Sequence, residues 1–152
     1  MSTLLVKHAE LLVTMNDDHL RIPGGGLFVR DNVIEQVGPT AELPSDSDHV
    51  IDAKGMYVYP GMIAPFTGVG VTGFPGAGND MDELGASTPH MDPVDAINPE
   101  DDCIEVTRID GVTTVLTTSG TRGVLNGKAV VLNLEGNIVD ELVLEKDVLA
   151  FI

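Results

Sequence analysis

Cysteine is almost missing from this chain: Cys103 is the one cysteine among 152 residues. A single thiol excludes an internal disulfide and a cysteine-rich zinc site. Long apolar runs are missing too, since no stretch of about 18 apolar residues is present and none is expected to cross a membrane. The first residues lack the basic start and the long apolar stretch of a signal peptide. We expect a soluble cytoplasmic protein.

Basic side chains are scarce as well. Eight Lys and Arg residues stand against 24 Asp and Glu residues, which gives a net charge of −16. A surface this acidic repels nucleic acid phosphates and anionic lipids, so nucleic acid and membrane partners are excluded. Two explanations of the acidity stay open: a high-salt cytoplasm that screens the self-repulsion, or an acidic protein of an ordinary cytoplasm. Unfolding midpoints in low and molar salt distinguish them.

Short apolar runs separated by turn signals fill residues 1–61 and predict a small antiparallel β-sheet. We expect Leu4-Leu5-Val6 and Leu11-Leu12-Val13 to be separate strands and Gly24-Gly25-Gly26 to break the chain. The dipeptide Asp31-Asn32 tolerates positive φ and predicts a two-residue hairpin turn. Two further strands, expected to pair with each other, are Val50-Ile51-Asp52-Ala53 and Met56-Tyr57-Val58-Tyr59.

Residues 62–152 have a different pattern. Residues 62–99 are rich in glycine and proline and predict mostly loop. Asn98 is a candidate helix cap with Pro99 in the first turn, and this helix is expected to end at Gly111. The rest of the chain predicts a strand from Val112 to Thr117, a hairpin around Asn126-Gly127, and a final helix from about Val139 to Ala150.

Several segments together resemble the amidohydrolase superfamily. The most specific is Val50-Ile51-Asp52-Ala53-Lys54-Gly55 with the residues up to Met62-Ile63, which looks like the opening of the cytosine, guanine and hydroxyatrazine deaminase branch. Later pieces are similar to imidazolonepropionase-like members, and they are Gly78-Asn79-Asp80, Thr88-Pro89-His90, Ala96-Ile97-Asn98-Pro99 and Gly111-Val112-Thr113-Thr114-Val115. The resemblance covers nearly the whole chain.

The resemblance implies a mainly β fold with an α/β C-terminal part. Residues 1–61 would form half of a small β-sandwich, which strands from the far C-terminus complete in the family. Residues 62–152 would be the truncated start of a (β/α)8 barrel, since a whole barrel takes about 250 residues. The family hydrolyses C–N bonds of cyclic amides and amidines with a metal held by Asp-x-His-x-His on the first barrel strand. Residues two apart on a strand point to the same side, so both imidazoles reach one ion.

The metal motif is replaced in this sequence. The matching stretch is Ala64-Pro65-Phe66-Thr67-Gly68, in which Phe66 and Gly68 occupy the two histidine positions and Ala64 occupies that of the acid. None of these side chains can bind a metal. The sequence therefore predicts no catalytic residue, no metal ligand and no cofactor, with zinc or another divalent metal bound only if a partner chain completes the site.

Other candidate sites are less specific. Asn79, Asp80 and His90 are the candidates for a ligand pocket. Gly68 to Gly73 matches G-x-G-x-x-G, but the following Phe-Pro-Gly cannot propagate the helix that dinucleotide binding needs. Thr118 to Gly123 has the composition of an anion-binding loop, although a simple bend explains the same residues. Cys103 is expected to be a small buried hydrophobe.

Three functions follow from these observations. The leading hypothesis is a degenerate amidohydrolase-like domain without catalysis of its own. The second is a segment of a split or processed amidohydrolase that another chain completes, and the third is a non-catalytic module that binds a small molecule or a protein. Because open sheet edges and bare apolar faces need a cover, we expect a homo-oligomer or a second polypeptide.

Overall fold

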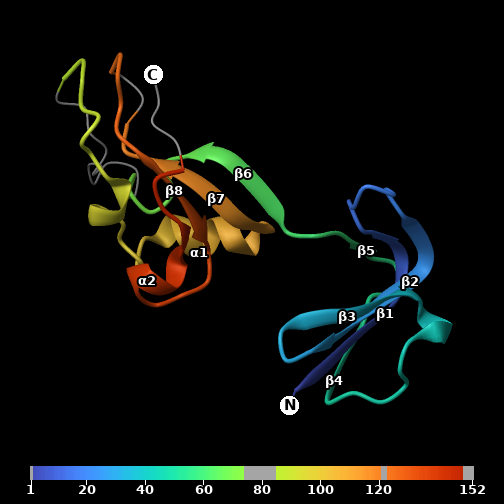
Figure 1. Ribbon diagram of the computed structural model, residues 1–152. Helices are drawn as coiled ribbons and strands as arrows, with labels where there is room; N and C mark the ends of the chain where they lie inside the picture. Colours follow the sequence, from blue (N-terminus) through green and yellow to red (C-terminus); the bar gives the residue numbers. More distant parts are fainter. Residues whose placement is uncertain (1, 74–84, 121–122, 149–152) are drawn as a thin grey trace. The chain divides into compact units, whose positions relative to one another are not determined.

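A computed structural model of the chain describes residues 2–73, 85–120 and 123–148. The chain divides into two compact units, Met1–Pro60 (unit 1) and Gly61–Ile152 (unit 2). Each unit has its own β-sheet, and the longer helix belongs to unit 2 (Figure 1). The prediction of a mainly β protein with an α/β second part is confirmed.

Unit 1 is a five-stranded sheet. Its strands run in the order β3-β2-β1-β4, and β5 also pairs with β1. A short 3-10 helix, η1 (Thr40–Glu42), follows β3. The strand bounds are β1 Thr3–Val13, β2 Arg21–Arg30, β3 Val33–Pro39, β4 His49–Asp52 and β5 Tyr57–Val58.

The prediction of two short strands before residue 14 is wrong, because β1 runs unbroken from Thr3 to Val13. A β-bulge lies between the two predicted strands: the register of β1 with β2 shifts between Val6 and Ala9, and His8 has a φ of 59°. The expected break at residues 24–26 is wrong as well, since these glycines lie inside β2. A Cβ on Gly26 would lie 2.3 Å from the Val6 carbonyl oxygen, so glycine here permits close strand approach.

The sheet of unit 1 is mixed and not antiparallel as predicted. β4 and β5 do not pair with each other; each pairs in parallel with β1, at Leu4 to Lys7 and at Leu11 to Leu12 respectively. A turn between them is fixed by the Ala53 amide, which donates to the Lys7 carbonyl at 2.8 Å. The Asp31-Asn32 hairpin is confirmed, with φ values of 46° and 67°.

Unit 2 begins with a β-α-β unit. β6 (Met62–Thr67) pairs in parallel with β7 (Val112–Thr118), and the connection contains η2 (Pro93–Asp95) and α1 (Asp102–Ile109). A parallel pair needs such a crossover, which places a helix on one face of the sheet. β8 (Ala129–Asn133) and β9 (Val143–Glu145) add antiparallel strands in the order β6-β7-β8-β9, with the one-turn helix α2 (Val139–Leu142) before β9.

Three predictions for unit 2 need correction. The hairpin around Asn126-Gly127 is wrong: β8 pairs with β7, while the Asn126 side chain accepts from the Gly123 amide at 2.9 Å within the connecting loop. The long final helix is wrong because residues 139–145 form α2 and β9; its last two residues lie outside the described residues. The first helix starts at Asp102 and is capped by Asp101, while Asn98 accepts from the Glu100 amide at 3.0 Å in the preceding turn.

The core of unit 2 lies between its sheet and α1 (Figure 1). Strand residues Val115, Val130 and Leu132 contribute one side, and Ile104 of α1 contributes the other. Leu134 and Leu142 close the cluster beyond β8. No helix in the described residues is both long and apolar enough to cross a membrane.

Candidate functional site

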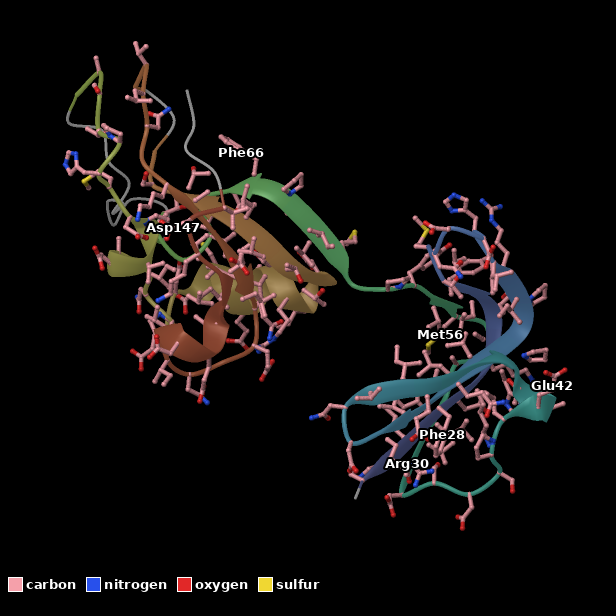
Figure 2. The ribbon with its side chains drawn as sticks, in the orientation of Figure 1. Phe28, Arg30, Glu42, Met56, Phe66 and Asp147 are labelled. Carbon is pink, nitrogen blue, oxygen red and sulfur yellow. The ribbon has the colours of Figure 1, made fainter. Side chains whose placement is uncertain are left out.

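The positions that match the metal motif lie at the end of β6. Ala64 is half-buried against the core of unit 2, whereas Phe66 is 55% exposed. Figure 2 shows Phe66 on the side of β6 that faces away from α1. Gly68 follows the last residue of the strand and begins a turn, in which its carbonyl accepts from the Val71 amide at 3.0 Å.

Two threonine hydroxyl groups donate hydrogen bonds to backbone carbonyls where β6 and β7 end. The Thr67 Oγ1 donates to the Leu116 carbonyl at 3.2 Å, and the Thr117 Oγ1 donates to the Val69 carbonyl at 2.7 Å. The two hydroxyl oxygens lie 3.3 Å apart. Because Thr117 is fully buried, these bonds satisfy polar groups that water does not reach.

A buried carboxylate fixes the turn after β6 to the start of α1. Asp101 is 7% exposed, and its Oδ2 accepts from the Gly70 amide at 3.1 Å. Its Oδ1 caps α1 by accepting from the Cys103 amide at 2.9 Å. Gly70 has a φ of 88°, which favours glycine at this position. The contact of Asp101 with Gly70 joins residues far apart in the chain and therefore requires the fold.

The cysteine lies in the first turn of α1, next to the capping carboxylate of Asp101. Burial, and then the negative charge of Asp101, raises the pKa of the Cys103 thiol, which keeps it protonated at neutral pH. The thiol lies 3.7 Å from the Gly73 carbonyl oxygen. Cys103 is half-buried, whereas the sequence predicted a buried residue.

The residues at the end of β6 do not fit the divalent metal that the family uses. Ala64, Phe66 and Gly68 offer no ligating atom, and the neighbouring Thr67 and Thr117 hydroxyls take part in internal hydrogen bonds. Across residues 2–73, 85–120 and 123–148, no group of three or more His, Cys, Asp and Glu side chains is placed to hold a metal ion. Zinc and similar ions prefer imidazole, thiolate and carboxylate ligands, so no metal-dependent step can be assigned here.

The candidate ligand pocket is only partly described. Asn79 and Asp80 lie outside the described residues. His90 is exposed in a turn, where the Met91 amide donates to the Thr88 carbonyl at 3.1 Å. The structure thus places one of the three candidate residues and leaves their grouping a prediction.

Two loop motifs also have a place in the structure. In the G-x-G-x-x-G match, the Val71 and Thr72 amides both donate to the Gly68 carbonyl, which makes a turn; the next helix of the described chain after this turn is η2. A dinucleotide site needs a helix directly at this point. In the loop from Thr118, the buried Thr118 Oγ1 has no hydrogen-bond partner among the residues that the structure describes, and Ser119 donates to the Lys128 carbonyl at 3.5 Å. These contacts are those of a bend leading into β8.

The chain is similar in sequence to curated deaminases, while no family model matches it. It is 31% identical over 96 residues to a 5'-deoxyadenosine deaminase of Methanosarcina mazei, which covers 63% of this chain and 22% of that protein. It is 33% identical over 76 residues to a 5-methylthioadenosine/S-adenosylhomocysteine deaminase of Lawsonia intracellularis, covering 49% of this chain and 17% of that protein. The chain thus spans about a fifth of the length of these relatives.

The structural likeness extends further along the chain. An amidohydrolase from Thermotoga maritima MSB8 superposes with a TM-score of 0.80 at 26% identity, covering 97% of this chain and 38% of that one. Both units therefore have the fold expected from the resemblance. In sequence and in fold, this chain is similar to proteins of the amidohydrolase superfamily.

Proposed function

We propose that this chain is an amidohydrolase-like domain that does not hydrolyse C–N bonds on its own. The observation that carries the proposal is the absence of ligating atoms at Ala64, Phe66 and Gly68. The names of its relatives associate the family chemistry with hydrolytic deamination of adenosine-type nucleosides. In such a reaction a metal lowers the pKa of its bound water, and this chain supplies no group at β6 to hold that metal.

The hydrogen bonds around the end of β6 also support a structural role. The Thr67 and Thr117 hydroxyls bind backbone carbonyls, and Asp101 fixes the following turn to α1. A catalytic carboxylate would instead face open space near a substrate. The polar groups of this region therefore stabilise the chain itself.

A segment of a composite hydrolase is the alternative proposal. In that case another polypeptide would supply the metal ligands, including replacements for both imidazoles of the first strand. A binding module around Asn79, Asp80 and His90 is the third. Native mass spectrometry distinguishes these proposals, because it reports oligomer size, bound metal and any stoichiometric second chain. We also propose a cytoplasmic location and association with either a second copy or another polypeptide.

Metal binding by restored ligands tests the leading proposal. The wild-type chain is expected to bind no Zn²⁺ beyond a weak surface background in a calorimetric titration. The double variant Phe66→His/Gly68→His restores two imidazoles at the spacing of the family motif, and we expect it to bind Zn²⁺ at least about tenfold more tightly. Ammonia release from adenosine-type nucleosides is expected to be absent in the wild type.

A matched control keeps the number of histidines and changes only their spacing. Ile63→His/Gly68→His puts the imidazoles five residues apart, up to about 16 Å along an extended chain, which is too far for both to reach one ion. Ile63 is 71% exposed, so the change costs no core packing. Tight stoichiometric Zn²⁺ in the wild type would contradict the proposal, and equal gains in both double variants would mean that β6 is not the ligand strand.

A further inference from the structure

Two connecting segments of unit 2 pair with each other beside its sheet. Residues 85–92 belong to the connection between β6 and α1, and residues 123–128 belong to the connection between β7 and β8. The Val124 amide donates to the Ala86 carbonyl at 2.8 Å. Figure 1 shows the two segments, in yellow-green and orange, next to each other. Here this pair of segments is called the loop arm.

The loop arm contains Asn126-Gly127, the one Asn-Gly pair in the sequence. An asparagine side chain can react with its own chain: the next backbone nitrogen attacks Cγ, a five-membered ring forms and ammonia leaves. Glycine in second place hinders this attack least, because it has no Cβ. Every other asparagine of the chain is followed by a residue with a side chain. Asn126 is therefore the asparagine whose neighbour best permits deamidation.

The folded loop arm holds the Asn126 side chain in place. Its Oδ1 accepts from the Gly123 amide at 2.9 Å, and its Nδ2 donates to the Gly123 carbonyl at 3.4 Å. Asn126 is only 9% exposed, so water has little access to it. Ring closure needs the Asn126 Cγ to reach the Gly127 nitrogen, and this movement disturbs both hydrogen bonds.

The glycine is fixed by its surroundings as well. A Cβ on Gly127 would collide with the Met91 carbonyl oxygen and the Ser119 hydroxyl, so packing requires glycine here. The following Lys128 amide donates to the Met91 carbonyl at 2.9 Å, and the Lys128 Nζ lies 3.3 Å from the Asp92 Oδ2. The fold thus demands the residue that makes the dipeptide labile, and the same contacts keep its backbone in place.

We propose that Asn126 is a deamidation site controlled by the loop arm, protected while the arm is closed and reactive when it opens. In the reaction the Gly127 nitrogen loses its proton and bonds to the Asn126 Cγ, the Cγ–Nδ2 bond breaks, and this nitrogen leaves as ammonia. Water then opens the ring at either carbonyl, which gives aspartate or isoaspartate. The reaction consumes one water, releases one ammonia and needs no oxidant or cofactor.

Either product changes the loop arm. Aspartate keeps the acceptor for the Gly123 amide but loses the donor to the Gly123 carbonyl, and it adds a negative charge to a chain of −16. Isoaspartate lengthens the backbone by one methylene group and so changes the spacing of the residues that pair with residues 85–92. His90 lies in the arm, so the modification also alters the surroundings of a candidate ligand residue. The proposal uses no residue of the metal motif and is independent of the proposed function.

Peptide mapping measures the modification directly. Trypsin cleaves after Arg122 and Lys128 and releases residues 123–128, in which mass spectrometry detects –OH in place of –NH2 and chromatography separates the isoaspartyl form. The 152-residue chain is incubated at mildly alkaline pH, folded and in guanidinium. We expect Asn126 to deamidate at least about tenfold faster in the unfolded chain, since the folded chain reacts only through its open fraction. Asn133, which precedes a leucine, is the internal reference and should stay unmodified.

Two matched variants test the contribution of the arm. Asp92→Asn removes a negative partner of Lys128 and keeps a side-chain oxygen to cap η2, and we expect it to speed deamidation of the folded chain about threefold. Asp95→Asn makes the same charge change at an exposed position of η2 and should leave the rate unchanged. Guanidinium below the unfolding transition should also change the folded rate little, because opening the arm exposes little surface.

Other outcomes overturn the proposal in distinct ways. Equal rates in the folded and unfolded chains would show that the loop arm gives no protection. An unmodified Asn126 in the unfolded chain would show that it is not a modification site. A folded rate that rises steeply in low guanidinium would mean that the reaction follows unfolding of the whole unit. Equal acceleration by both variants would assign the effect to net charge and not to the Lys128 contact.

Discussion

The two units both have a sheet with one covered face, but they cover it by different means. In unit 2 the crossover between β6 and β7 supplies α1, and Ile104 packs with strand residues in a core of eight buried hydrophobic residues. In the described part of unit 1 the cover comes from η1 and its loop, through Leu43. Its buried residues form two separate clusters of three.

This difference between the two cores follows from the way in which the strands of each unit are connected. Parallel neighbours require a long crossover, and a helix in that crossover has an apolar side available for the sheet. The hairpin from β2 to β3 needs only Asp31-Asn32 and brings no cover with it. Unit 2 therefore has one core of eight buried hydrophobic residues, whereas unit 1 has two smaller clusters.

The largest expected effect is in the core of unit 2. Leu132 has no exposed surface, and we expect Leu132→Ala to lower the free energy of unfolding by about 4 kcal/mol through lost burial and a residual cavity. Leu5→Ala in the smaller cluster of unit 1 should cost about 2 kcal/mol. Urea unfolding with hydrogen exchange resolved by unit measures both. Equal costs would remove the contrast between the two cores.

A smaller effect is expected from close strand approach in unit 1. Gly26→Ala would bring a Cβ to 2.3 Å from the Val6 carbonyl oxygen, a backbone atom that cannot turn away. We expect a loss of about 3 kcal/mol. Gly24→Ala is the control, because a Cβ at this position would have no atom within 4 Å. Its cost comes only from the φ of 63°, and we expect a loss of stability of about 1 kcal/mol. Thermal unfolding of the two variants should rank them in this order; the reverse ranking would contradict the packing of β1 on β2.

The smallest effect concerns pH and the edge of unit 1. The Thr3 amide and hydroxyl donate to Asp48 at 2.8 and 2.9 Å, which lowers the pKa of this carboxyl below its ordinary value. A lowered pKa stabilises the fold above the unfolded value and loses that contribution as pH falls through the folded value. Asp48→Asn should therefore lower the unfolding midpoint at about pH 6 and make little difference at about pH 2. A difference that is constant over this range would show that the carboxylate charge is unimportant.

Some local structure was predictable because the responsible interactions are short in sequence. The Asp31-Asn32 turn needs two residues that tolerate positive φ, and β7 is an uninterrupted apolar and β-branched run. The final helix failed for the opposite reason. Residues after Leu142 pair with β8, and that pairing overrides a weak helical pattern.

The candidate site also has features that the sequence predicts and features that it does not. The replacement of the metal ligands is readable from Ala64, Phe66 and Gly68, because side-chain chemistry alone decides whether an atom can bind a metal. The hydrogen bonds at the end of β6 cannot be predicted from the sequence. Thr67 and Thr117 lie far apart along the chain and meet only because β6 and β7 are parallel neighbours.

The amino-acid sequence was sufficient for the class of fold and the superfamily resemblance, since each depends on composition or on residues close together in the chain. The tertiary structure alone decided the mixed pairing of unit 1 and the role of Asp101. These depend on register, which sets the neighbours of a side chain across strands and which a shift of one residue would reverse.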